Sequence, residues 1–195
     1  MAARAWSPRE RMVYSAAQLI RERGVTGTGV RDVVERADAP RGSFQHYFPD
    51  GKDQLVSDAL GFAGDFAAGW VARYGQSARR PTPSGLFAHL AEYWRRELSR
   101  HDFERGCPLM ATAADSLAGD AALTEPLRAA LTRWEGAVAD ALRTTGVPRP
   151  RCRPLATLML STLEGAVVLA RVHGSTRPLA TVVRELGPLL DDAVA

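Results

Sequence analysis

Apolar residues recur every three or four positions along almost the whole chain. One such stripe lies within residues 8–23 and a second within residues 30–37, and similar stripes follow to the C-terminus. This spacing is typical of amphipathic helices, whereas the alternation of two that marks a strand does not extend over any useful length. The pattern therefore predicts an all-α chain.

Residues with special backbone preferences set the limits of the predicted helices. Ser7 is a favourable N-cap, Pro8 suits the first helical position, and Gly24 is suited to end this first helix. A short second helix is expected at Val30–Ala37, and a short third helix begins at Arg41. Longer helices are expected at about 52–74, 86–100, 108–118, 124–144, 155–173 and 178–194, with loops at 79–85 and 147–154.

The bulk properties place the chain among ordinary globular proteins. Its 195 residues are enough for one or two domains with buried cores. No apolar stretch approaches the ~20 residues of a membrane span, and the N-terminus lacks an apolar signal segment. Two cysteines do not make a disulfide scaffold, and the four histidines have no metal-ligand spacing. We therefore expect a cytoplasmic protein with no membrane partner, metal or cofactor.

Net charge does not by itself indicate a nucleic-acid partner. The chain carries a formal charge of +3, and residues 1–53 hold nine basic side chains against seven acidic ones. Binding to nucleic acid would have to come from the placement of these charges, and it would weaken steeply with salt.

The stretch APRGSFQHYF, residues 39–48, is too short and polar for a core helix. At ~100° per residue, Phe44 and Phe48 share one face and can anchor the helix, while polar side chains occupy the opposite arc. Three short helices followed by a long one are the arrangement of a helix-turn-helix module. In the DNA major groove, arginine can pair with guanine and glutamine with adenine. The third helix is therefore a candidate reader of double-stranded DNA.

Residues 8–60 resemble the DNA-binding domain of the tetracycline-repressor (TetR) family of bacterial transcription regulators. The matching stretches are AAQLI (16–20), RG (23–24), VRDVVERA (30–37) and RGSFQHYFPDGKDQL (41–55). The FPDGK form, GCPLMATAADS (106–116) and EGAVVLARV (164–172) are similar to the LmrA/YxaF-like subgroup. Two departures from the family pattern, Gly29 and Pro40, remove hydroxyl groups, so weaker helix capping is expected there.

The resemblance implies a two-domain all-α regulator, with a DNA-binding domain at 1–53 and a ligand-binding and dimerisation domain at 54–195. The last two helices, about 155–173 and 178–194, would pair with their copies in a homodimer. A homodimer is also favoured by the residues themselves, because these helices carry more apolar surface than one small core hides. The expected function is repression at a palindromic operator, with recognition helices ~34–36 Å apart, relieved by a small lipophilic or aromatic ligand.

Arg41 and Gln45 are the candidates for reading base edges. Phosphate contacts, which fix register more than sequence, are expected near the starts of the second and fourth helices and along the third. The remaining DNA-binding candidates are Thr28, Arg31, Gly42, Ser43, His46, Tyr47 and Lys52. Tyr47 could equally be a core aromatic residue, and a lone surface arginine is usually only solvated.

Aromatic and thioether side chains after residue 54 could line an apolar ligand pocket or simply fill a core. The candidates are Phe66, Trp70, Tyr93, Trp94, Cys107, Met110, Trp134, Met159, Leu163 and Glu164. Glu164 stands among apolar residues and could pair with a ligand cation, with Arg128 or Arg171, or face a dimer seam. Cys107 could be a redox switch or a structural residue at a helix start.

Two other function classes remain open. A DNA-binding dimer without a ligand would have a closed, dry core in its C-terminal domain. An enzyme would have to use Cys107 or Glu164, but no base is placed beside Cys107, and paired carboxylates and a cofactor loop are absent from the sequence. We therefore expect a protein that is not an enzyme and has no catalytic residues.

Overall fold

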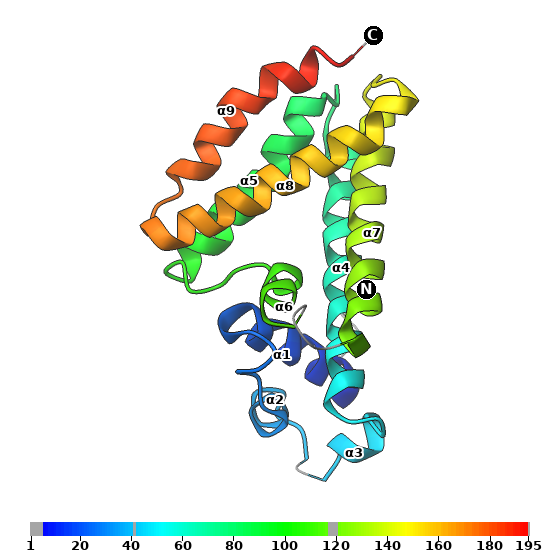
Figure 1. The fold of residues 1–195 in the computed structure, drawn as a ribbon, viewed down its shortest axis with the longest axis vertical. Helices are drawn as coiled ribbons and strands as arrows, with labels where there is room; N and C mark the ends of the chain where they lie inside the picture. Colours follow the sequence, from blue (N-terminus) through cyan, green and yellow to red (C-terminus); the bar gives the residue numbers. More distant parts are fainter. Residues whose placement is uncertain (1–5, 41, 117–120, 195) are drawn as a thin grey trace. The chain divides into compact units, whose positions relative to one another are not determined.

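The computed structural model describes residues 6–40, 42–116 and 121–194, and within these ranges the chain forms nine helices and no strand (Figure 1). The predicted all-α class is confirmed. The helices are α1 (Pro8–Arg23), α2 (Val30–Arg36), α3 (Phe44–Tyr47), α4 (Lys52–Ser77), α5 (Pro83–Arg100), α6 (Pro108–Ser116), α7 (Ala121–Thr144), α8 (Arg149–His173) and α9 (Arg177–Asp191).

The chain divides into two compact units. The first comprises residues 1–64 and 107–130, and the second comprises residues 65–106 and 131–195. The long helices α4 and α7 therefore each contribute residues to both units. The domain limits expected from the sequence, 1–53 and 54–195, stay a prediction.

Helix α1 begins and ends where its sequence predicts. Ser7 Oγ accepts a hydrogen bond from Glu10 N at 3.2 Å, and Glu10 Oε2 accepts one from Ser7 N at 2.8 Å. This capping box satisfies two N–H groups at a helix start that would otherwise lack partners. Gly24 ends the helix with a φ of 76°, a left-handed conformation that glycine adopts without strain.

The core of the first unit joins α1, α2 and α4 to the residue after α3. Five of its side chains have a relative exposure of 0%: Met12 and Ile20 of α1, Val33 of α2, Leu60 of α4, and Phe48, which follows α3. Full burial of one large apolar side chain contributes about 1.5–3 kcal/mol, so these contacts hold the short helices in place.

In the second unit, α5, α8 and α9 pack against one another (Figure 1). Ser84 N at the start of α5 donates to Asp191 Oδ1 at the end of α9 at 3.0 Å. Arg171 of α8 donates to the carbonyl oxygens of Phe103 and Glu104 at 3.2 and 2.8 Å. These bonds tie both ends of α5 to the two C-terminal helices.

Helix α3 is shorter than the sequence predicts, because it begins at Phe44 and not at Arg41. Ser43 N and Ser43 Oγ both donate to Pro40 O, at 2.9 and 2.7 Å. These two bonds close a turn ahead of α3. Ser43, which was predicted to lie inside the helix, belongs to this turn. Arg41 lies outside the described residues.

The start of α8 also differs from the prediction, since residues 149–154 are helical and were expected to form a loop. Pro150 occupies the first turn, where the N–H that proline lacks has no partner in any helix. Pro154 has no N–H to donate to the carbonyl oxygen of Pro150 one turn earlier. Pro150 is exposed, so water can reach this carbonyl. Cys152 is buried and its Sγ lies 3.5 Å from Val147 O, which fixes this turn to the preceding segment.

Other helix ends differ from the predictions by a turn or less. Helix α4 continues to Ser77, α5 begins at Pro83 after the capping Thr82, α7 begins at Ala121, and α9 ends at Asp191. Residues 117 and 118, expected to end the sixth helix, lie outside the described ranges.

Helix α8 is the one helix in the described part of the chain that is long and apolar enough to cross a membrane by length and composition. The sequence does not contain an uninterrupted apolar run of this length, because polar residues are interspersed along α8. Its most apolar window is 44% buried within the fold. Membrane-spanning helices have this composition, and so do helices that pack against other protein surfaces. The exposed face of α8 includes Leu158, Val168, Leu169 and Val172.

Candidate nucleic-acid interface

Two ion pairs hold α2 against α1 in the first unit. Arg36 donates through Nη1 and Nη2 to the two carboxylate oxygens of Glu22 at 2.8 and 2.9 Å. Arg23 Nη2 donates to Asp32 Oδ2 at 2.8 Å. The hydrogen bonds to Glu22 raise the pKa of Arg36 above its ordinary value, so this two-point pair stays charged and fixes direction as well as distance.

Arg11 ties the end of α2 to α1. Its Nε donates to Ala37 O at 2.8 Å and its Nη2 donates to Asp38 O at 3.1 Å. Carbonyl groups at a helix C-terminus lack partners within the helix, so the guanidinium caps α2 from its neighbour. Asp38 has a φ of 47°, and the chain turns there from α2 toward α3. One side chain thus fixes the turn between the two helices.

Helix α3 is anchored through its aromatic face, as the sequence predicts. Phe48 is fully buried, and the Phe44 ring stacks on it with centroids 5.3 Å apart and planes inclined by 29°. The guanidinium carbon of Arg9 lies 5.5 Å from the Phe48 centroid, and Arg9 Nη2 donates to Asp58 Oδ2 at 2.6 Å. The anchor therefore links α3 to both α1 and α4.

The other face of α3 exposes polar side chains. Gln45 and His46 are exposed, and the half-buried Tyr47 ring meets the His46 ring edge-on with centroids 4.9 Å apart. Gln45 Nε2 donates to Pro49 O at 3.1 Å, which holds the amide beside the helix end. Gly42 is exposed, and beyond its chain neighbours a Cβ there would meet no atom of a described residue within 4 Å. The backbone before α3 is therefore open to a close approach by a partner.

Thr28 and Lys52 direct their polar atoms into the protein. Thr28 is only 2% exposed and its Oγ1 donates to Gly24 O at 2.7 Å, while Lys52 Nζ donates to Val25 O at 2.7 Å. Arg31, in contrast, is exposed. Of the arginines described within residues 6–64, it is the one whose side chain makes no hydrogen bond or ion pair.

Sequence reasoning missed Arg11, Arg36 and Asp115, which organise the module. Asp115 Oδ2 of α6 accepts a hydrogen bond from Thr26 N at 2.6 Å. Each of these side chains has a partner far away in the sequence, so no local pattern separates it from a solvated surface residue. Only helix spacing combined with a known packing of α1, α2 and α6 would have revealed them.

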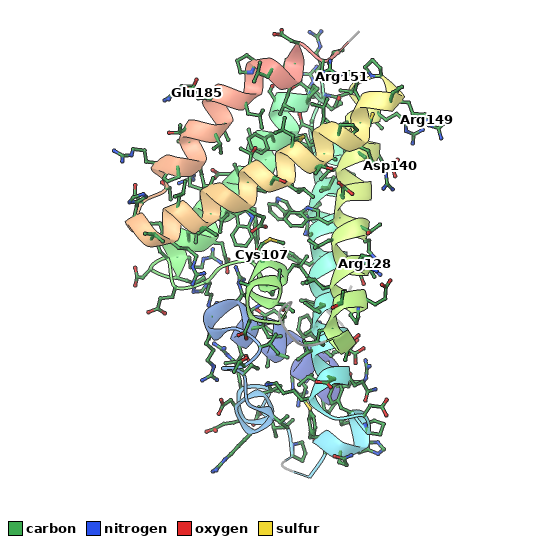
Figure 2. All side chains as sticks on the ribbon, viewed as in Figure 1. Cys107, Arg128, Asp140, Arg149, Arg151 and Glu185 are labelled. Atoms are coloured by element: carbon green, nitrogen blue, oxygen red, sulfur yellow. The ribbon has the colours of Figure 1, made fainter. Side chains whose placement is uncertain are left out.

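The ligand candidates are divided between the two units. Cys107, which lies at the start of α6 (Figure 2), and Met110 belong to the first unit. The other candidates belong to the second unit, where Trp94, Trp134, Met159, Leu163 and Glu164 are buried, Trp70 and Tyr93 are half-buried and Phe66 is exposed.

Phe66, Trp70 and Tyr93 form one partly exposed aromatic layer on α4 and α5. The Phe66 and Tyr93 centroids are 5.5 Å apart, and those of Trp70 and Tyr93 are 5.1 Å apart. The His89 ring stacks on Trp70 at 4.9 Å, and the Arg73 guanidinium carbon lies 4.7 Å from the Trp70 centroid. The fold therefore brings together three of the predicted ligand-binding residues, with the guanidinium group of Arg73 beside them.

Two buried groups of the second unit carry polar atoms. Trp134 is 4% exposed, and its Nε1 makes no hydrogen bond to any described residue. A buried donor left in this way costs about 1–3 kcal/mol, so an acceptor brought to Nε1 would be favourable. Glu164 is 7% exposed. Arg171, one partner considered for Glu164, directs its Nε and Nη2 to backbone carbonyls, and Arg128 pairs with Glu125 at 2.7 Å.

An anchored, polar-faced α3 behind a fixed turn is the arrangement of a helix-turn-helix module. Residues 14–59 match the family model of bacterial regulatory proteins of the tetR family. Residues 83–185 match the model of the C-terminal domain of LmrA/YxaF-like transcriptional regulators. The chain therefore belongs to the TetR family and to its LmrA/YxaF-like subgroup. This confirms the resemblance seen in the sequence, and members of these families are DNA-binding regulators and not enzymes.

Relatives and solved structures agree with this assignment. The chain is 40% identical over 190 residues to the uncharacterized HTH-type transcriptional regulator Rv0196 of Mycobacterium tuberculosis, covering 94% of each chain. It is 27% identical to the HTH-type transcriptional regulator LmrA of Bacillus subtilis, covering 88% of this chain and 90% of that one. A TetR transcriptional regulator structure from Chloroflexus aurantiacus is 27% identical with a TM-score of 0.73, covering 93% of this chain and 92% of that one.

Proposed function

We propose that this regulator is a repressor that binds a palindromic operator as a homodimer and releases it when a small lipophilic or aromatic ligand binds. It would act in the cytoplasm, with residues 1–53 as the DNA-binding domain and 54–195 as the ligand-binding and dimerisation domain. The observation that carries the proposal is the division of polar side chains in the module. Arg11, Arg23 and Arg36 are used internally, whereas Arg31 and Gln45 stay exposed.

The exposed groups suggest how DNA would be held. Gln45 would read a base edge, together with Arg41, which lies outside the described residues. Arg31, His46 and the hydroxyl of Tyr47 would contact phosphates, and the open backbone at Gly42 would allow a close approach. Ser43 would join them by turning its Oγ away from Pro40 O, to which it donates. Thr28 and Lys52 have polar atoms bound within the module, so we assign them a supporting role through the turn that they hold.

The exposed face of α8 supports a homodimer. Leu158, Val168 and Val172 are 45%, 53% and 77% exposed, and they share this face with the exposed small residues Ser161 and Gly165. Small residues between large apolar ones allow a second helix to approach closely. Leu189 of α9 adds another exposed apolar side chain, at 63%. Contiguous apolar surface of this kind marks an interface more often than a solvated face, and TetR-family regulators commonly act as dimers.

The buried polar groups of the second unit support a ligand site there. The Trp134 Nε1 donor would gain a hydrogen bond from an acceptor atom on the ligand, and the buried Trp94, Met159 and Leu163 would provide apolar surface. Glu164 would favour a ligand with a donor or a positive charge. The predictions for Cys107 and Met110, which belong to the first unit, stay predictions.

A titration with DNA and ligand tests the proposal. The purified protein is added to a duplex that covers the region upstream of its own gene, and to duplexes that it selects from its source genome, at low and at physiological salt. We expect nanomolar binding to a site with two-fold symmetry, and release by members of a set of neutral and cationic aromatic compounds. Absence of binding to any duplex at low salt would reject the proposal.

A DNA-binding dimer without a ligand is the second candidate. It would bind the same operator, but no aromatic compound would change its affinity for DNA. The buried Trp134 Nε1 favours the ligand-responsive form, because a core selected only for packing would provide this donor with a partner.

A further inference from the structure

Asp115, near the end of α6, fills the concave side of the turn between α1 and α2. Its Oδ2 accepts a hydrogen bond from Thr26 N at 2.6 Å. The same oxygen lies 2.9 Å from the position that a Cβ on Gly24 would take. Position 24 needs glycine because of its φ of 76°, and a Cβ there would also push the Asp115 carboxylate away from the turn.

The carboxylate is charged under ordinary conditions. The hydrogen bond from Thr26 N is the main cause that lowers the pKa of Asp115 below its ordinary value, and the positive charge of Lys52 lowers it further. A charged acceptor makes a stronger hydrogen bond to a backbone N–H than a neutral one does.

The turn is also held from other sides. Lys52 Nζ donates to Val25 O, and Thr28 Oγ1 donates to Gly24 O, both at 2.7 Å. Gly29 then begins α2 without any side-chain cap, as expected from the missing hydroxyl. The start of α2 therefore takes its position from the turn and from the ion pair of Asp32 with Arg23, because no cap of its own fixes it.

We propose that Asp115 is a positioning residue for DNA binding. By holding the turn, it fixes the start of α2 and the exposed guanidinium of Arg31 in the first helical turn. This inference rests on the proposed function, since it takes Arg31 as a phosphate contact. It connects α6 to the DNA-binding surface through the hydrogen bond at Thr26, without requiring Asp115 to touch DNA.

Asp115→Ala separates positioning from simple charge. A carboxylate near DNA repels phosphates, so removal of its charge alone would strengthen binding. Loss of the positioning hydrogen bond would instead weaken DNA binding. We expect Asp115→Ala to bind a duplex selected by the wild-type protein about tenfold more weakly, which corresponds to about 1.4 kcal/mol. The Thr26 amide hydrogen, measured without DNA, should exchange faster in the variant.

Two further variants serve as controls. Asp115→Asn keeps an acceptor oxygen but removes the charge, and it should recover most of the lost affinity. Asp192→Ala removes the same charge from an exposed side chain of the second unit that makes no hydrogen bond or ion pair with any residue the structure describes, and it should bind as the wild type does. If Asp115→Ala unfolds at the assay temperature, Asp115→Ser takes its place, because the shorter side chain cannot reach Thr26 N.

The outcomes separate this inference from the function on which it rests. A wild-type protein that binds no duplex at low salt would refute the proposed function and this role together. A wild type that binds, with Asp115→Ala equally tight or tighter, would overturn the role of Asp115 alone. Equal weakness of the Ala and Asn variants, with the Thr26 amide still protected in both, would also overturn it, because the hydrogen bond would then not matter.

Discussion

The rings of Phe44 and Phe48 stack with their centroids 5.3 Å apart, across one turn of a helix that is only four residues long. A helix of this length is not stable by its own hydrogen bonds, because nucleation is unfavourable and few bonds follow. The aromatic pair supplies the missing stability by burying Phe48 completely in the core of the first unit. The polar side chains of α3 are thus held in place by apolar contacts on its other face.

Phe48→Ala should destabilise the first unit strongly. Removal of a fully buried aromatic ring costs about 3–5 kcal/mol, and here it also removes the ring on which Arg9 and Phe44 lie. Urea unfolding followed by circular dichroism measures the loss. Phe44→Ala is the matched control and should cost less, because Phe44 is only half-buried. Equal effects of the two substitutions would contradict this account of the anchor.

Arg31→Ala and Lys52→Ala should differ in their effect on the salt dependence of DNA binding. A lost phosphate contact reduces the slope of log K against log salt by ~1 per half-site, so Arg31→Ala should flatten the plot. Lys52→Ala should weaken binding with a nearly unchanged slope, since Lys52 Nζ donates to Val25 O. Fluorescence anisotropy at several salt concentrations gives both slopes. A flatter slope for Lys52→Ala would show that its ammonium group leaves the turn and contacts phosphate.

Val168→Glu on the exposed face of α8 should dissociate the proposed homodimer. A carboxylate buried in an apolar interface without a partner costs several kcal/mol, so the dimer dissociation constant should rise by at least ~100-fold. Sedimentation velocity over a concentration series measures it. Ala72→Glu, at an exposed position of α4, adds the same charge elsewhere and should leave the dimer intact. An unchanged dimer in Val168→Glu would place the interface on another surface.

Glu92 should contribute stability that depends on pH. Hydrogen bonds from Arg95 and then Arg96 lower the pKa of Glu92 from 4.5 to about 2. A carboxyl with a lowered pKa stabilises the folded state above its ordinary pKa, and this contribution is lost as pH falls from about 4.5 toward about 2. Because Glu92 is partly solvated, Glu92→Gln should cost less than about 1 kcal/mol at pH 7.

The difference between Glu92→Gln and the wild type should disappear near pH 2, and urea unfolding over a pH series checks this. Glu35→Gln is the control and should show little change at any pH, because the exposed Glu35 side chain makes no hydrogen bond or ion pair with a described residue. A constant difference between wild type and Glu92→Gln across the whole range would contradict the ion-pair explanation.

Local signals in the sequence predicted much of this protein correctly. Ser7, Pro8 and Gly24 set the bounds of α1 because capping depends on residues adjacent in the chain. The spacing of Phe44 and Phe48 predicted their shared face, and the motif at residues 41–55 identified the family. The start of α8 was predicted poorly, because proline is compatible with a first helical turn as well as with a loop.

Tertiary structure decided which polar side chains are available to a partner. The sequence offers Arg11, Arg31 and Lys52 as equivalent basic residues, yet only Arg31 among these three projects from the described surface without a hydrogen bond or ion pair. The hydrogen bond from Thr26 N to Asp115 joins segments far apart in the chain. Periodicity and capping act over a few residues, so the sequence alone determined the helices and the family. Contacts between distant helices determine how those helices use their charges, and these contacts exist only once the chain has folded.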